Sequence, residues 1–165
     1  MNRNLLAGVL FLMGAFIAGH EAQAQESKFK ALFLYKFSEY IEWPNSEQNI
    51  VVGVIGKSDV YDELVTFAAS RDNLTVIKIN GASELDKCNI LFVPSGQERI
   101  IGEVAPAASQ KSVLIVSDTD KQVGSGSDIG FYLEQNKLRF LISKGSIESK
   151  KMTPSTKLLA LGKVI

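Results

Sequence analysis

The chain has 165 residues, with 18 lysine and arginine residues against 18 aspartate and glutamate residues, one histidine and one cysteine. A formal net charge of zero argues against a protein that binds nucleic acid or an anionic membrane through charge. A single cysteine excludes an internal disulfide, and the length suits one domain with a workable core.

Residues 1–24 have the features of a cleavable secretory signal peptide. Arg3 supplies the positive charge, and the apolar run over 5–18 is shorter than the roughly 20 residues that span a bilayer. Small residues at Ala22 and Ala24 form a cleavage site. We therefore expect a periplasmic protein whose mature chain begins near Gln25.

Cleavage removes His20 and leaves 17 basic and 17 acidic residues. A mature chain without histidine excludes Ser-His-Asp and Cys-His nucleophile systems and histidine-ligated zinc or copper. A general base would have to be a carboxylate or a lysine with a shifted pKa, and the sequence contains no constellation that would shift one. We expect no catalytic residue, no metal site and no cofactor.

The first predicted element of the mature chain is a helix over 27–43, with Ser27 as its N-cap and Pro44 after its end. Apolar runs predict buried strands, and amphipathic runs predict helices between them. The strands are expected at 50–56, 74–79, 89–93 and 113–116, and the helices at 59–69 and 97–110. This alternation predicts an α/β fold, a Rossmann-like three-layer domain with a mostly parallel sheet.

The pattern changes after a loop at 118–128. Residues 129–133 and 138–142 alternate apolar and polar side chains, and Gln135 and Asn136 between them suit the turn of an antiparallel hairpin. Residues 155–163 are predicted to close the chain as a helix. No repeat or second domain is visible, so 25–165 is expected to form a single domain.

The predicted first helix is unusually apolar. Six of the twelve aromatic residues that follow Ala24 lie between Phe29 and Trp43, and the apolar arc covers about 200° against the somewhat more than 100° of an ordinary surface helix. Such a helix is either buried on two sides or lends one side to a partner. The candidate partner-binding residues are Tyr35, Phe37, Tyr40 and Trp43.

A second candidate site follows from topology, because ligands of open parallel sheets bind beyond the carboxyl ends of the strands. Ordinary turns and helix caps use the same residue types, which is the competing interpretation. Cys88, at the start of a strand, favours a structural role. The candidate ligand-binding residues are Lys57, Ser58 and Asp59 after the first strand, Ser95 and Gly96 after the third, and Ser117 and Asp118 after the fourth.

The segment from Lys30 to Pro44, KALFLYKFSEYIEWP, resembles the opening helix of the YfiR-like family of periplasmic proteins. The resemblance continues in order through VGVIG at 52–56, CNILFV at 88–93, LIVSD at 114–118, the hairpin at 129–142 and the closing segment at 155–164. It therefore covers nearly all of the mature chain.

The resemblance implies a Rossmann-like domain, usually a homodimer, that restrains a membrane-anchored diguanylate cyclase and so controls cyclic-di-GMP and biofilm formation. The chain departs from the family where Asn89 replaces a frequent histidine, where Ser143 replaces a frequent asparagine, and where Cys88 stands alone. We expect a non-enzymatic regulator that contacts a membrane signalling protein. The alternative is a small-molecule sensor that acts on a sensor kinase or similar receptor.

Overall fold

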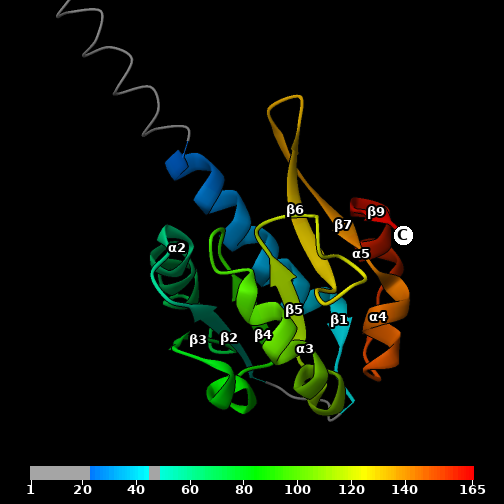
Figure 1. The fold of residues 1–165 in the computed structure, drawn as a ribbon. Helices are drawn as coiled ribbons and strands as arrows, with labels where there is room; N and C mark the ends of the chain where they lie inside the picture. The colour runs from blue at the N-terminus through cyan, green and yellow to red at the C-terminus, as the bar shows by residue number, and fades with distance from the viewer. Residues whose placement is uncertain (1–22, 45–48) are drawn as a thin grey trace, which may run out of the picture.

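The computed structural model describes residues 23–44 and 49–165 (Figure 1). Most of the predicted signal peptide, 1–22, lies outside the described residues. The N-terminal helix is described over 23–40. The elements that follow are β1 (Ile41–Glu42), β2 (Ile50–Ile55), α2 (Asp59–Ala68), β3 (Leu74–Ile79), the 3-10 helix η1 (Ala82–Lys87), β4 (Ile90–Val93), α3 (Arg99–Lys111), β5 (Leu114–Ser117), β6 (Ile129–Glu134), β7 (Lys137–Ile142), α4 (Lys144–Ser149), β8 (Thr153–Pro154), α5 (Thr156–Leu161) and β9 (Lys163–Val164).

Seven strands form the main sheet in the order β3-β2-β4-β5-β6-β7-β9. Strands β2 to β6 run parallel, and β7 turns back antiparallel to β6. The strand order reverses at β2, which has β3 on one side and β4 on the other. The predicted α/β fold with a mostly parallel sheet and an antiparallel hairpin is confirmed, and the reversal places a crevice position at the carboxyl ends of β2 and β4.

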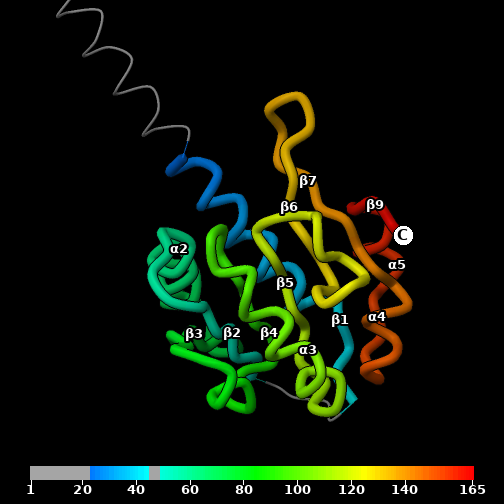
Figure 2. The backbone as a smooth tube through the Cα atoms, in the orientation of Figure 1, coloured from blue at the N-terminus to red at the C-terminus, as the bar shows by residue number. Residues whose placement is uncertain are grey.

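An apolar core lies on each face of the sheet. One core contains buried residues of the N-terminal helix, α2, α4 and α5, and the other contains those of η1 and α3. In Figure 2 the N-terminal helix passes behind β5 and β6, whereas α3 lies in front of the sheet. The fold therefore has three layers, and the N-terminal helix is part of one outer layer.

The N-terminal helix differs from its prediction at both ends. Ser27 lies inside the helix and is buried, so it is not the N-cap. The helix ends at Tyr40, because Ile41 and Glu42 form β1 and pair antiparallel with β8. A helix that ends before Pro44 agrees with the steric restriction that proline imposes on helical backbone at the residue preceding it.

The hairpin has the predicted turn and register. Gln135 and Asn136 both have positive φ, 50° and 59°, which is the requirement of a two-residue type I′ turn. Phe131 lies opposite Phe140, and Leu133 lies opposite Leu138. The apolar side chains of the two strands therefore share one face, and the N-terminal helix packs against its inner part at Phe131 and Phe140.

A buried ion pair joins α4 to the sheet. Lys150, at the end of α4, lies 2.6 Å from the fully buried carboxylate of Asp128 and also donates to the carbonyl of Val113. Asp128 accepts further hydrogen bonds from the backbone N–H of Ile115 and the hydroxyl of Ser146. These bonds satisfy both charges, as a buried pair requires.

Candidate functional site

The segment after β2, which contains predicted ligand-binding residues, forms a turn and the N-cap of α2. Gly56 makes the turn with φ +63°, and the hydroxyl of Ser58 caps α2 by accepting a hydrogen bond from the N–H of Val60 at 3.2 Å. Lys57 and Asp59 are exposed beside it. This arrangement matches the capping interpretation of the segment.

The predicted residues after β4 and β5 are brought together, and they meet a residue of the N-terminal helix. Both the backbone N–H and the hydroxyl of Ser95 donate to Asp118, at 3.4 and 3.2 Å. The ammonium group of Lys30 lies 2.5 Å from Asp118 and 2.5 Å from Glu26. We call Glu26, Lys30, Ser95 and Asp118 the Lys30 clamp, because they fix the helix to the carboxyl edge of the sheet.

The Lys30 side chain is only 10% exposed. Burial acts to lower the pKa of Lys30, but bonding to Asp118 and to Glu26 outweighs burial and raises the pKa above its ordinary value of 10.5. The charged form is therefore favoured inside the clamp. The sequence placed Lys30 in the first-helix motif without indicating that it pairs with Asp118.

Ser117, one of the predicted ligand-binding residues, bonds within the protein. It is fully buried, and its hydroxyl donates to the carbonyl of Thr119 at 2.6 Å and lies 3.0 Å from the hydroxyl of Ser127. The side chain points into the loop over 118–128 and stabilises it. Gly96, by contrast, is exposed at a turn with φ +84°.

Two of the four predicted partner-binding residues belong to the core. Phe37 is fully buried against Phe131 and Phe140, with ring centroids at 6.1 and 5.1 Å, and Trp43 is 9% exposed. The wheel alone did not show which part of the wide apolar arc faces the sheet. Phe37 and Trp43 are therefore corrected to core residues, and Tyr35 and Tyr40 are the half-buried pair at the surface.

Tyr35 and Tyr40 are surrounded by cations. The guanidinium of Arg71 lies 4.3 Å from the ring centroid of Tyr35, and the ammonium group of Lys157 lies 5.0 Å from that of Tyr40. Lys36 lies over both rings, at 5.0 and 5.6 Å. We call Tyr35, Lys36, Tyr40, Arg71 and Lys157 the aromatic–basic surface; each cation–π contact contributes about 0.5–1 kcal/mol at exposed positions.

Glu39 adds an anion to this surface. It accepts a hydrogen bond from the phenol of Tyr35 at 2.5 Å and pairs with Lys36 at 2.7 Å. Burial acts to raise the pKa of Glu39, but bonding to Lys36 and Tyr35 lowers the pKa below its ordinary value. The sequence did not predict Arg71 and Lys157 here, because they come from other parts of the chain.

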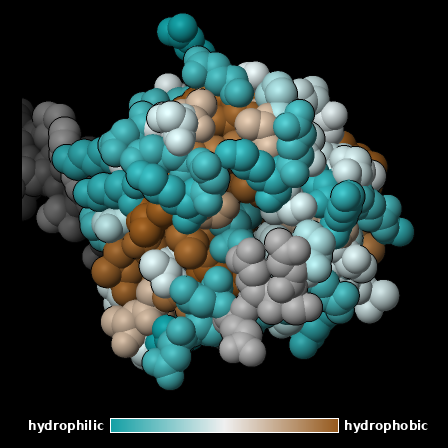
Figure 3. Space-filling model, turned by 90° about the horizontal axis from the view of Figure 1, so that it is seen from below, coloured by the Kyte–Doolittle hydropathy of each residue, from teal (hydrophilic) through white to brown (hydrophobic). Residues whose placement is uncertain are grey.

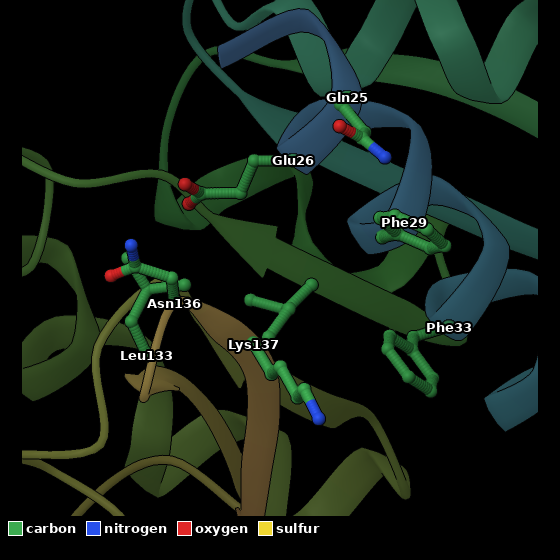
Figure 4. Close-up of a pocket in the computed structure, with 8 residues that line it drawn as sticks. Gln25, Glu26, Phe29, Phe33, Leu133, Asn136 and Lys137 are labelled. Atoms are coloured by element: carbon green, nitrogen blue, oxygen red, sulfur yellow. The ribbon is translucent and has the colours of Figure 1, made fainter. Parts of the chain in front are cut away.

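A groove of about 630 Å³ lies between the N-terminal helix and the tip of the β6–β7 hairpin. Figure 4 shows Phe29 and Phe33 on the helix side, with Leu133, Asn136 and Lys137 on the hairpin side. We call it the helix–hairpin groove. Its lining residues are Gln25, Glu26, Phe29, Phe33, Leu133, Asn136, Lys137 and Leu138.

A second, more polar hollow of about 470 Å³ lies at the opposite edge of the sheet, where β4 and β5 begin and α3 ends. Figure 3 shows the molecule from below, where hydrophilic residues predominate with apolar patches among them. Cys88 lines this hollow but is 6% exposed, and burial raises the pKa of its thiol to about 12. A thiol in this state is a poor nucleophile at neutral pH.

Among residues 23–44 and 49–165, no three or more histidine, cysteine, aspartate or glutamate side chains are grouped in a way that would hold a metal ion. In the same part of the chain, no helix combines the length and apolar character required to cross a membrane.

Comparison with known proteins identifies a family and shows similarity in fold to solved structures. The family described as YfiR/HmsC-like matches residues 27–163. No curated protein matches the chain significantly. A solved structure of an ABC domain in complex with L-Trp from Streptococcus pneumonia is similar in fold, with a TM-score of 0.59 and 12% identity. The match covers 84% of this chain and 62% of that one, so it supports the α/β fold alone.

Proposed function

The chain belongs to the YfiR/HmsC-like family, and we propose that it is a non-enzymatic periplasmic regulator that binds and restrains a membrane-anchored diguanylate cyclase. The observation that carries the proposal is the family match over 27–163, which supports a periplasmic regulator of diguanylate cyclase at the level of the family. Release of the restraint would raise cyclic-di-GMP and favour biofilm formation.

We place the contact at the aromatic–basic surface. Tyrosine and arginine are enriched among the residues that dominate binding energy in protein interfaces. The rings of Tyr35 and Tyr40 are half-buried and held by cations, so little side-chain freedom is lost when a partner covers them. Glu39 balances Lys36, and the remaining cations, Arg71 and Lys157, favour an acidic surface on the partner.

The restraint requires that the regulator bind one state of the cyclase more tightly than the other. A ligand or signal then changes activity only through a difference in affinity between the two states. The homodimer that the resemblance implies would present two copies of the aromatic–basic surface to a dimeric target. The contact can therefore hold two cyclase subunits in one arrangement.

Capture from detergent-solubilised inner membranes tests the contact. The exported protein is expected to retain a diguanylate cyclase, identified by mass spectrometry, and Tyr35→Ala combined with Tyr40→Ala is expected to reduce recovery about tenfold or more. Tyr132→Ala, another half-buried tyrosine on β6, serves as the matched control and should retain the cyclase. Failure to recover any cyclase, from a protein that is monomeric in solution, would contradict the proposal.

The alternative function, a small-molecule sensor that binds its ligand at the carboxyl ends of β2, β4 and β5, has less structural support than the regulator. Ser58, Ser117 and Asp118 all bond to neighbouring groups of the chain. A ligand there would have to replace those bonds, and a buried polar group that loses its partner costs about 1–3 kcal/mol.

A further inference from the structure

Gln25 is the residue that cleavage of the predicted signal peptide leaves at the N-terminus. The small residues Ala22 and Ala24 place the cut after Ala24. A glutamine that begins a chain carries a free α-amine beside its own side-chain amide. Because the two groups belong to one residue, they are held close together and can react with each other without a partner.

The fold leaves the reacting groups of Gln25 accessible. The residue is exposed, and Figure 4 shows it on the helix side of the helix–hairpin groove. Across 23–44 and 49–165, no hydrogen bond joins its side-chain amide to another residue. After cleavage its backbone nitrogen is among the first four of the helix, which have no intrahelical acceptor. A reaction between the two groups therefore costs the helix no hydrogen bond.

The surroundings of the new N-terminus favour the loss of its charge. The start of a helix bears a partial positive charge, which opposes an ammonium group and favours the neutral amine. The neutral amine is the form that attacks a carbonyl carbon. The carboxylate of the next residue, Glu26, is already bound by Lys30 at 2.5 Å, so it compensates a second cation only weakly.

We propose that the chain is cut after Ala24, that Gln25 then cyclises to pyroglutamate, and that the ring stabilises the start of the N-terminal helix. The α-amine nitrogen attacks the side-chain carbon Cδ and forms the N–Cδ bond of a γ-lactam. The Cδ–Nε2 bond breaks, and Nε2 leaves as ammonia with a proton from the amine. No atom is oxidised or reduced, and no co-reactant is needed. The mature chain then begins with an uncharged ring beside the Lys30 clamp.

Intact mass spectrometry tests the proposal on protein that is recovered from the periplasm and kept at neutral pH for several days. The expected mass is that of residues 25–165 less one ammonia, about 17 Da. Fragmentation of the N-terminal peptide should assign the loss to Gln25.

Gln25→Asn is the matched control. It keeps a side-chain amide at the N-terminus but is one methylene group shorter, so cyclisation would require a strained β-lactam. Because Gln25 is exposed, the variant should fold as the wild type does. Its mass should show no loss of ammonia.

Thermal unfolding of the wild-type chain before and after conversion tests the effect on the helix. The melting temperature should rise by about 1–3 °C on conversion, because a positive charge is removed from the helix N-terminus. The proposal is overturned if the mature chain begins at another residue, if its mass stays that of unmodified 25–165, if Gln25→Asn loses the same mass, or if conversion lowers the melting temperature. Recovery of the cyclase plays no part in these measurements, so this inference and the proposed function can fail separately.

Discussion

Phe37 is the residue on which the two interpretations of the first helix diverge. A docking residue would be replaceable without loss of folding, whereas a core residue would not. Phe37 packs with Phe33, Phe131 and Phe140 in one aromatic cluster and has no exposed surface. Its contribution should therefore be to stability.

Phe37→Ala is expected to lower the free energy of unfolding by about 3–5 kcal/mol, because it removes a buried ring and leaves a cavity. Tyr40→Ala, on the half-buried side of the same helix, should lower it by less than half as much. Urea denaturation of the two variants measures the difference. Equal losses would mean that the helix is oriented differently from the structure.

At the scale of the element, the N-terminal helix is fixed to the rest of the protein at its middle and at its first turns. Its middle packs into the core through Leu34 and Phe37, and its first turns are fixed by the Lys30 clamp. Because Lys30 bonds both to its own helix and to the end of β5, the clamp decides how closely the start of the helix lies to the sheet. Stability that depends on Lys30 should follow the charge of that residue.

Lys30→Met should lower the free energy of unfolding by about 2 kcal/mol at neutral pH, because Asp118 loses its cation. The pKa of Lys30 is raised in the folded state from 10.5, so its contribution is complete below that pH and is lost as the pH rises through the folded pKa. Urea titrations of both proteins from pH 7 to pH 11.5 should give a constant difference that shrinks above about 10.5. A difference that grows with pH would contradict the clamp.

At the scale of the whole molecule, the Asp128–Lys150 pair connects the sheet to the layer that contains α4. Lys150→Met should lower the free energy of unfolding by about 3–5 kcal/mol, because it leaves a buried carboxylate without its cation. In the double variant that combines Lys150→Met with Asp128→Asn, the free energy of unfolding should fall by at least about 1 kcal/mol less than the sum of the losses in the two single variants. Additive losses in thermal or urea unfolding would mean that the pair is not coupled.

The sequence predicted what is local and periodic. The strands β2 to β5 follow from short apolar runs, the helices α2 and α3 from helical spacing, and the register of Phe131 with Phe140 from alternation. The two-residue strands β1 and β8 and the six-residue α4 have no such period, and they form because of partners far away in the chain. Their absence from the prediction has that physical cause.

For the candidate site, too, the sequence predicted the local features and missed the contacts between distant segments. Helical spacing correctly marked the first helix as unusually apolar, but only the sheet decides that Phe37 faces inward and Tyr35 outward. The cations Arg71 and Lys157 reach the aromatic–basic surface from α2's end and from α5, a relationship that no local pattern contains. The groove likewise depends on two segments about a hundred residues apart.

The pairing of β1 with β8 has a consequence for the order in which the protein acquires its structure. Ile41 lies opposite Pro154, and the core that contains Phe37 also contains Leu158. A chain that leaves the ribosome or a membrane channel with its N-terminus first therefore presents an aromatic segment long before its permanent neighbours emerge. Contacts of such large sequence separation form slowly, and the exposed segment is prone to aggregate while it waits. We therefore expect that this domain needs a chaperone to cover its first helix until its C-terminal strands and helices have emerged.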